Sequence, residues 1–444
     1  MDAGLELSST FSNRGRVQQD DFCAKRYSVI GTASTPRLVA FVLALPLVAC
    51  GPEGPEGPDF ERSDSAGIRI ALSREPQWLE DIGGALSETP ILEIGREEGE
   101  DAYLLSGVSG AARLSDGSVV VCNAADRTLR YFGPDGVYTH SGGGQGAGPG
   151  ELRRMTRCLQ RNGRTWVYQA PALPIEVFDE AGVRVASATI PKPGDRVARL
   201  LDIGEDGSLV LGQDAPRRDL DAGVSILPTT VFRSTADGEL VTLGTFDGAA
   251  WVRGDRVTFP AAFSPTLQAA AVGDLTVVSW PESFDLALIG REGATSVRLR
   301  RVVLPTSVSA AHRSAFELRV LEGPMPAGDT PYEDEQIRRA IVDMMVYPAV
   351  FPAHYRVITS TDHYLWVERG DGPRDPLPQV ADPNPSPTTW DVFSPEGRWL
   401  GPVEMPARYD PSEIGGAYVL GVHRDELGVE RVRMYHLTKP RLDR

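Results

Sequence analysis

The chain has 444 residues, a length that fits either three average domains or one large β domain built from repeats. Its 46 glycines and 35 prolines speak for frequent turns and against a mostly helical protein. The 45 Lys and Arg residues against 61 Asp and Glu residues give a net charge of −16, which argues against a nucleic-acid partner.

An apolar run near the N-terminus, Leu38–Val48, has the properties of an export signal. It follows Arg37 and is shorter than the roughly 20 apolar residues that a membrane-spanning helix needs. Its length matches a signal-peptide core of roughly 7 to 15 residues. We therefore expect residues 1–49 to be a signal peptide. Because residues 1–36 are long for such a segment, we also expect that the start codon is assigned too far upstream.

The run ends in Leu47-Val-Ala-Cys50, which resembles the lipobox of bacterial lipoproteins. The resemblance implies that Cys50 becomes the first residue and carries acyl chains such as palmitate, each buried methylene contributing about 0.8 kcal/mol of membrane affinity. Gly51 after this cysteine implies, by the sorting rule of Gram-negative lipoproteins, an outer-membrane location facing the periplasm. The alternatives are a secretory signal with a chance cysteine, or a buried core strand.

A short Gly/Pro-rich segment follows Cys50. Three Gly-Pro-acid triplets fill positions 51–59, too few for a collagen helix, so residues 50–66 are predicted to be a tether. The folded domain is then expected to span residues 67–440. We expect it to be a monomer that reaches the membrane only through Cys50.

A turn followed by a short apolar strand recurs six times in this domain. Asn-Gly and Asp-Gly favour tight hairpins, and the β-branched or aromatic residues after them suit a buried strand. The copies begin at Asp116, Asn162, Asp206, Gly273, Asp362 and Gly415. The first two spacings, 46 and 44 residues, each fit one repeat unit.

A second element follows five of the six copies: a short apolar strand before another glycine turn. These strands are Leu129–Phe132, Ile175–Phe178, Thr230–Phe232, Leu286–Ile289 and Trp390–Phe393. Each unit therefore contains four antiparallel strands, which is one blade of a β-propeller. The sequence predicts an all-β fold, a six-bladed β-propeller, with a generic β-sandwich as the alternative.

Two departures from the repeat are expected. Around residues 305–350 the apolar residues recur at helical spacing, which predicts a short helical insertion between blades four and five. We expect its apolar stripe to fill the gap between those sheets rather than to cap one face. The sixth unit has no outer strand, so the N-terminal strand Pro90–Ile94 is predicted to close this last blade.

Two cysteines, Cys122 and Cys158, lie in the folded domain. They are expected on the second strand of blade one and the first strand of blade two. A disulfide between them is possible in an exported protein, and two buried free thiols are the alternative.

Four segments of the chain carry a family resemblance: Asp64–Ile70, Leu92–Gly95, Arg113–Asn123 and Gly146–Leu152. With them, roughly residues 64–438 resemble bacterial six-bladed β-propeller lipoproteins related to the NHL-repeat propellers. The resemblance implies a fold and a cell-envelope setting, and most such proteins have no known activity.

Enzymatic activity rests on weaker signals. Propellers that resemble gluconolactonases or amidating lyases hold a divalent cation with Asp, Asn, Glu or His, and the residues placed for this role are Asn123, Asp126, Asp202 and Asp274. These residue types are also the ordinary turn formers, and the six histidines show no metal-binding spacing. No catalytic residue and no cofactor are assigned.

Two functions follow from these patterns. The first is a membrane-anchored binding module at the cell envelope that holds an unknown protein or small-molecule ligand. The alternative is a metal-dependent hydrolase or lyase of the lactonase-like type with its site in the central channel. Three or more metal-binding side chains on the channel axis would favour the second, and an apolar or arginine-lined channel would discard it.

Overall fold

The computed structural model describes residues 59–78, 83–217, 220–235, 238–255, 257–323, 331–374 and 385–440. The chain divides into two units, Met1–Glu56 and Gly57–Arg444. The signal peptide, Cys50 and residues 51–58 of the tether lie outside the described residues. The account below concerns the second unit.

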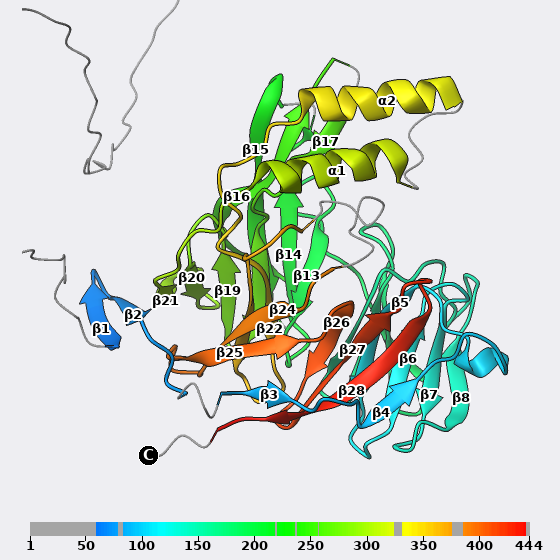
Figure 1. Ribbon diagram of the computed structural model, residues 1–444. Helices are drawn as coiled ribbons and strands as arrows, with labels where there is room; N and C mark the ends of the chain where they lie inside the picture. Colours follow the sequence, from blue (N-terminus) through cyan, green and yellow to red (C-terminus); the bar gives the residue numbers. More distant parts are fainter. Residues whose placement is uncertain are drawn as a thin grey trace, which may run out of the picture. The chain divides into compact units, whose positions relative to one another are not determined.

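Strands of the described residues form six sheets, numbered here I to VI in chain order (Figure 1). Sheet I contains β5 (Val108–Arg113), β6 (Val119–Asn123), β7 (Thr128–Phe132) and β8 (Tyr138–Gly143). Sheet II contains β9 (Arg157–Arg161), β10 (Arg164–Tyr168), β11 (Ile175–Phe178) and β12 (Arg184–Ala188). Sheet III contains β13 (Arg199–Ile203), β14 (Leu209–Asp214), β15 (Gly223–Ser234), β16 (Leu240–Arg253) and β17 (Thr258–Pro260).

The remaining three sheets include strands from the N-terminal part of the domain. Sheet IV contains β18 (Gln268–Val272), β19 (Leu275–Ser279), β20 (Asp285–Ile289), β21 (Thr295–Arg301), β2 (Ile68–Ser73) and β1 (Phe60–Ser65). Sheet V contains β22 (His354–Thr359), β23 (Leu365–Arg369), β24 (Thr388–Phe393) and β25 (Trp399–Met405). Sheet VI contains β26 (Tyr409–Ile414), β27 (Tyr418–Arg424), β28 (Glu430–Thr438), β3 (Ala85–Leu86) and β4 (Leu92–Ile94), and a 3₁₀ turn, η2 (Asp101–Tyr103), follows.

The predicted repeat of turns sets the first hairpin of each sheet. In sheet I, Gly117 takes a positive φ of 89°, and the Asp116 carboxylate accepts a hydrogen bond from the Ser118 backbone N–H at 2.9 Å. In sheet II, Asn162 takes a φ of 51° at the same place. Such left-handed turns are tolerated best by Gly and Asn, so these residues fix where β5 and β9 reverse.

Apolar side chains pack between neighbouring sheets all the way round. One buried cluster joins each consecutive pair, from sheets I and II to sheets V and VI. A sixth cluster contains Val119 and Val121 of sheet I together with Leu420 and Val432 of sheet VI. The core is therefore a closed series of sheet-to-sheet interfaces, and the fold is a β-propeller rather than a sandwich.

The predicted closure by an early segment is confirmed. Strand β4 pairs antiparallel with β28, with Ile94 opposite Val432 and Leu92 opposite Met434. The Arg433 guanidinium also donates a 2.6 Å hydrogen bond to the Glu93 carboxylate, 340 residues away in the chain. This pairing covers the edge of β28 that would otherwise be exposed.

A hairpin that the sequence analysis did not predict precedes the propeller strands. Residues 60–65, placed in the tether by that analysis, form β1 and pair with β2. Strand β2 then pairs in parallel with β21, with Ala71 opposite Leu299. The folded domain thus starts earlier than the predicted boundary at residue 67, because Ala66 and Gly67 form a turn and not the end of a tether.

The helical insertion is present, but it packs in a different place from the one expected. Helices α1 (Ala310–Glu322) and α2 (Pro331–Met344) follow β21 in the chain (Figure 1). Phe316 and Ile341 pack with Val252 of β16 and Phe259 of β17, in sheet III. The reason is the length of β15 and β16, which have 12 and 14 residues and extend past the shorter strands β13 and β14, with 5 and 6 residues. The stripe therefore covers this extension and does not fill the gap between sheets IV and V.

Candidate ligand-binding channel

The first strands of all six sheets line one cavity. Its volume is 880 Å³, and its walls come from β5, β9, β13, β18, β22 and β26 with the turns that follow them. This volume lies within the range of small-molecule sites in proteins. The cavity is therefore the central channel of the propeller, and one strand of every sheet lines it.

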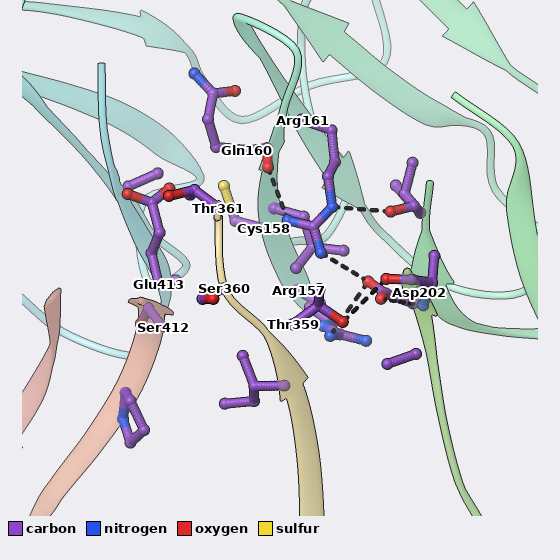
Figure 2. A pocket seen from close by; sticks show the side chains of 18 of the residues that line it. Arg157, Cys158, Gln160, Arg161, Asp202, Thr359, Ser360, Thr361, Ser412 and Glu413 are labelled. Carbon is purple, nitrogen blue, oxygen red and sulfur yellow. Dashed lines mark hydrogen bonds and ion pairs between the residues drawn. The ribbon is translucent and has the colours of Figure 1, made fainter. Parts of the chain in front are cut away.

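Two arginines of sheet II share one carboxylate of sheet III in this channel (Figure 2). A terminal nitrogen of Arg161 lies 3.1 Å from Asp202 Oδ1, and Arg157 Nη2 lies 4.0 Å from the same atom. The other Asp202 oxygen accepts the backbone N–H of Ala271 at 2.9 Å, which ties sheet III to sheet IV. Asp202 is only 5% exposed, whereas the Arg157 side chain is 42% exposed.

The surroundings of Arg157 shift the pKa of its guanidinium in both directions. Burial lowers the pKa of its guanidinium, and Asp202 opposes this effect by raising the pKa. Arg161 and Arg356 lower the pKa further, because like charges disfavour the charged form. Three guanidinium groups from sheets II and V thus act on one region of the channel.

A second ion-pair group surrounds Arg356 of β22. Its guanidinium lies 2.9 Å from the buried Glu368 carboxylate and 2.5 Å from Asp410. Burial alone lowers the pKa of Arg356, but the two carboxylates outweigh it and raise the pKa above its ordinary value. Arg374 also pairs with Glu368, so this group is balanced in charge.

Sheet VI contributes an acidic wall. The Glu413 carboxylate accepts a 2.6 Å hydrogen bond from the Tyr418 hydroxyl and a 3.1 Å bond from the Arg113 backbone N–H. Burial raises the pKa of Glu413, and these two hydrogen bonds with the charges of Arg161 and Arg113 oppose the rise. In Figure 2, Glu413 lies at the left of the view, Arg157 near the centre and Asp202 at the right.

The four residues considered for a metal do not come together. Asn123 donates a 2.8 Å hydrogen bond to Asp126, which also pairs with Arg130, and neither residue lines the channel. Among the four, only Asp202 lies on the channel wall. Within the described residues, no three His, Cys, Asp or Glu side chains are grouped so that they could hold an ion.

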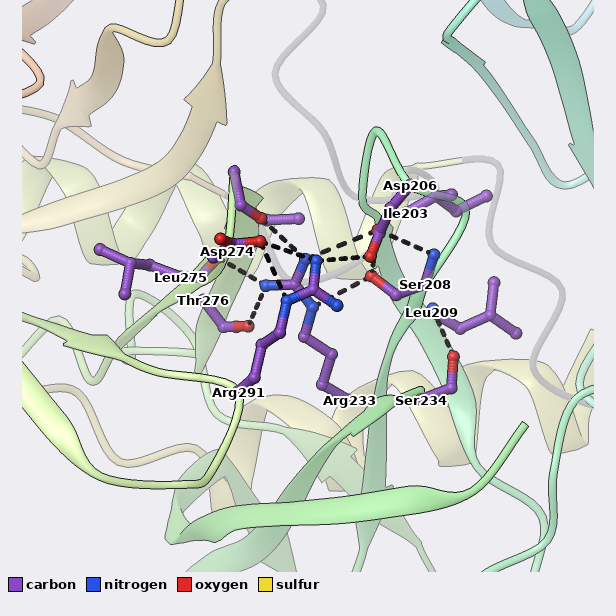
Figure 3. A network of polar contacts seen from close by, with 12 residues as sticks. Ile203, Asp206, Ser208, Leu209, Arg233, Ser234, Asp274, Leu275, Thr276 and Arg291 are labelled. Carbon is purple, nitrogen blue, oxygen red and sulfur yellow. Dashed lines mark hydrogen bonds and ion pairs between the residues drawn. The ribbon is translucent and has the colours of Figure 1, made fainter. Parts of the chain in front are cut away.

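Asp274 belongs to a separate network that joins sheets III and IV (Figure 3). Arg291 donates to the Asp274 carboxylate at 2.9 Å and to Asp206 at 2.5 Å. Burial would raise the pKa of Asp206, but hydrogen bonds from Ser208 and Arg291 lower it to about 2. Beside them, Arg233 is 2% exposed and donates to the carbonyls of β18–β19. This network holds turns of sheets III and IV together.

None of the six histidines is among the residues that line the channel. His354 is fully buried between sheets IV and V, where its Nε2 lies 2.9 Å from the Ser279 hydroxyl. Burial lowers the pKa of His354 to about 3. The imidazole is therefore neutral, and it packs between sheets IV and V.

Cys122 of β6 and Cys158 of β9 lie on adjacent sheets, as the sequence predicts. Their Cα atoms are 6.3 Å apart and their sulfur atoms are at bonding distance. The contact bridges sheets I and II beside the channel, where Cys158 lies next to Arg157 (Figure 2). A disulfide here would close the loop between the first two sheets.

The sequence analysis missed the channel arginines. Arg157, Arg161 and Arg356 stand in first strands, directly before the Asn-Gly and Asp-His turns that the repeat identified. An arginine inside a short strand that also carries apolar residues was the available signal. It pointed to the channel only once the register of the first strands was known.

Comparisons with known proteins show resemblance at the level of structure. No protein-family model and no curated protein matches the chain. A member of the DUF4221 family from Bacteroides vulgatus has a TM-score of 0.48 at 10% identity, covering 81% of this chain and 100% of that one. Virginiamycin B lyase from Staphylococcus aureus has a TM-score of 0.36 at 11% identity, with 79% and 99% covered.

A gluconolactonase from Xanthomonas campestris has a TM-score of 0.38 at 11% identity, covering 80% of this chain and 100% of that one. At such values these three structures carry no information about the activity of this chain. Among the described residues, no helix combines the length and the hydropathy that a membrane crossing requires.

Proposed function

We propose that the protein is an exported, lipid-anchored, six-bladed propeller that binds a ligand in its central channel at the cell envelope. The observation that carries the proposal is the 880 Å³ cavity, to which the first strands of all six sheets contribute. In this proposal the six sheets are the six blades, and β4 with β28 closes the last one. No reaction is assigned to the site.

The anchoring half of the proposal rests on Leu47-Val-Ala-Cys50 and the tether after it. Acylation of Cys50 would hold the domain on a membrane, and Gly51 favours the outer membrane, facing the periplasm. The experiment is expression of the wild type and Cys50→Ser in a Gram-negative host with a radiolabelled fatty acid. We expect the label and membrane retention only in the wild type, and a membrane-bound, unlabelled wild type would contradict the anchor.

The binding half is tested on protein purified gently from its membrane. Native mass spectrometry of the wild type should show a non-covalently bound small molecule. Ser412 lines the channel, so Ser412→Trp should block it and lose that mass. Ser63, exposed on β1, supplies the matched control Ser63→Trp, which should keep it. Equal retention in both variants would contradict channel binding.

The alternative, a metal-dependent hydrolase or lyase, would use the same cavity but needs a different set of side chains. A divalent cation needs three or more oxygen or nitrogen donors that converge. On this channel wall Asp202 already faces two guanidinium groups, which would repel a cation. Metal analysis of protein purified without chelator separates the two proposals: one equivalent of a bound divalent ion would favour the enzyme.

A further inference from the structure

We infer that the wall formed by β9 and β13 is an anion-binding site that takes the carboxylate or phosphate group of a small molecule through Arg157. This inference rests on the proposed function, because it assigns a chemical class to the ligand of the same channel.

The charge at this wall is not balanced. Arg157 and Arg161 face a single carboxylate, that of Asp202, and together they leave one positive charge in excess. Asp202 Oδ2 accepts the Ala271 N–H and Asp202 Oδ1 accepts Arg161, so Arg157 shares this carboxylate with two other donors. The 4.0 Å separation between Arg157 and Asp202 is longer than a hydrogen bond, in contrast to the 3.1 Å contact of Arg161.

Arg157 keeps donors that the protein does not use. Within the described part of the chain, one terminal nitrogen donates to the Leu201 carbonyl, and this is the hydrogen bond that fixes the guanidinium against β13. Its Nε–H and its other terminal nitrogen are left for a partner of opposite charge. An arginine with two such donors can hold a carboxylate or phosphate through two parallel hydrogen bonds.

Neighbouring charges favour the binding of an anion at Arg157. Arg161 and Arg356 place two further positive charges near Arg157, and these charges attract an anion to the same region of the channel. Asp410 of β26 and Glu368 of β23 are the carboxylates beside Arg356, and both are engaged by that guanidinium. An anion next to Arg157 would therefore complete an ion pair rather than break one.

The size and charge of the channel limit the rest of the ligand. A cavity of 880 Å³ holds a small molecule and not a polymer. Glu413 lies on the acidic wall of sheet VI, so a second anionic group would be repelled at that end. We therefore expect one anionic group, bound at Arg157, on a ligand whose other end is neutral.

The test is isothermal titration calorimetry on the Cys50→Ser protein, at constant ionic strength, with acetate and with inorganic phosphate as probes. Loss of two charge-assisted hydrogen bonds in Arg157→Gln should weaken binding of the preferred probe by about tenfold or more. Arg164, exposed on β10, gives the matched control Arg164→Gln, which should bind like the parent. The better of the two probes identifies the site as one for carboxylates or for phosphates.

A second variant tests the charge argument in the opposite direction. Asp202→Asn removes the carboxylate that competes for the two arginines and keeps an oxygen for the Ala271 N–H. We expect it to bind the anion several-fold more tightly, roughly the effect of one charge pair. A purely structural role for Asp202 would not increase affinity. Circular dichroism and thermal melting establish that each variant is folded before titration.

The outcomes decide the inference separately from the proposed function. Equal binding by Arg157→Gln and Arg164→Gln, or weaker binding by folded Asp202→Asn, would overturn the anion site. If Arg157→Gln still retains the ligand that co-purifies with the wild type, while Ser412→Trp loses it, the channel remains the ligand site and only its anionic class is wrong.

Discussion

Removing the side chain of Ile94 tests whether the early strand closes the ring. Ile94 lies on β4, is 1% exposed, and packs in the cluster between sheets VI and I. Ile94→Ala removes three carbon groups from a buried position, and the lost transfer energy plus the resulting cavity should cost about 3 kcal/mol. The backbone pairing of β4 with β28 would remain, so the loss reports packing across this interface.

The matched control lies three residues earlier. Ile91 belongs to the same segment, and its backbone N–H donates to the Met434 carbonyl at 2.7 Å, but its side chain is 57% exposed. Ile91→Ala should therefore cost less than about 1 kcal/mol. Urea unfolding followed by tryptophan fluorescence gives both values on the Cys50→Ser protein. Similar, small losses in both variants would refute the role of β4 in closing the ring.

Three further predictions concern stability and pH. Burial lowers the pKa of His354 to about 3, below its unfolded value of about 6.5. The contribution of neutral His354 to the free energy of unfolding is therefore complete above pH 6.5, is lost as the pH falls towards 3, and is smaller by about 3 kcal/mol at pH 4.5. Urea unfolding of His354→Gln should show a smaller loss of stability between pH 7.5 and 4.5. If Cys122 and Cys158 pair, their 36-residue separation predicts a loss of about 4 kcal/mol on reduction, and thiol titration of unfolded, unreduced protein should find neither thiol free. Because burial raises the pKa of Glu413, its carboxylate loses its charge at a higher pH than a free one, and calorimetry should find that the difference in anion affinity between the parent and Glu413→Gln shrinks as the pH falls.

Much of the fold could be predicted because its turns have local signatures. Asp116-Gly117 and Asn162-Gly163 each lie in the turn of a hairpin, and the apolar strands after these turns are in the predicted order. Closure by β4 was predictable for a topological reason, since the sixth unit had three strands and one edge to cover. The β1–β2 hairpin was not, because β1 is mostly exposed and carries no apolar alternation, so nothing in its sequence indicates a strand that pairs with β2.

The candidate site was less predictable, because it depends on register between sheets. Asp202 could be named from its type, but nothing local shows that Arg157 and Arg161 reach it from the preceding sheet. Asp274 looked equally suitable in the sequence and instead pairs with Arg291 in a turn network. The residue type alone cannot distinguish Asp202 from Asp274, because the two carboxylates differ in which charged groups face them in the folded protein.

The central claim is that the axis of the propeller holds an anion at Arg157. The most direct measurement is a crystal structure of the Cys50→Ser protein grown with selenate, with data collected at the selenium absorption edge. The account predicts an anomalous peak in the channel within hydrogen-bonding distance of the Arg157 guanidinium. Peaks confined to surface arginines such as Arg164, with no peak in the channel, would contradict it.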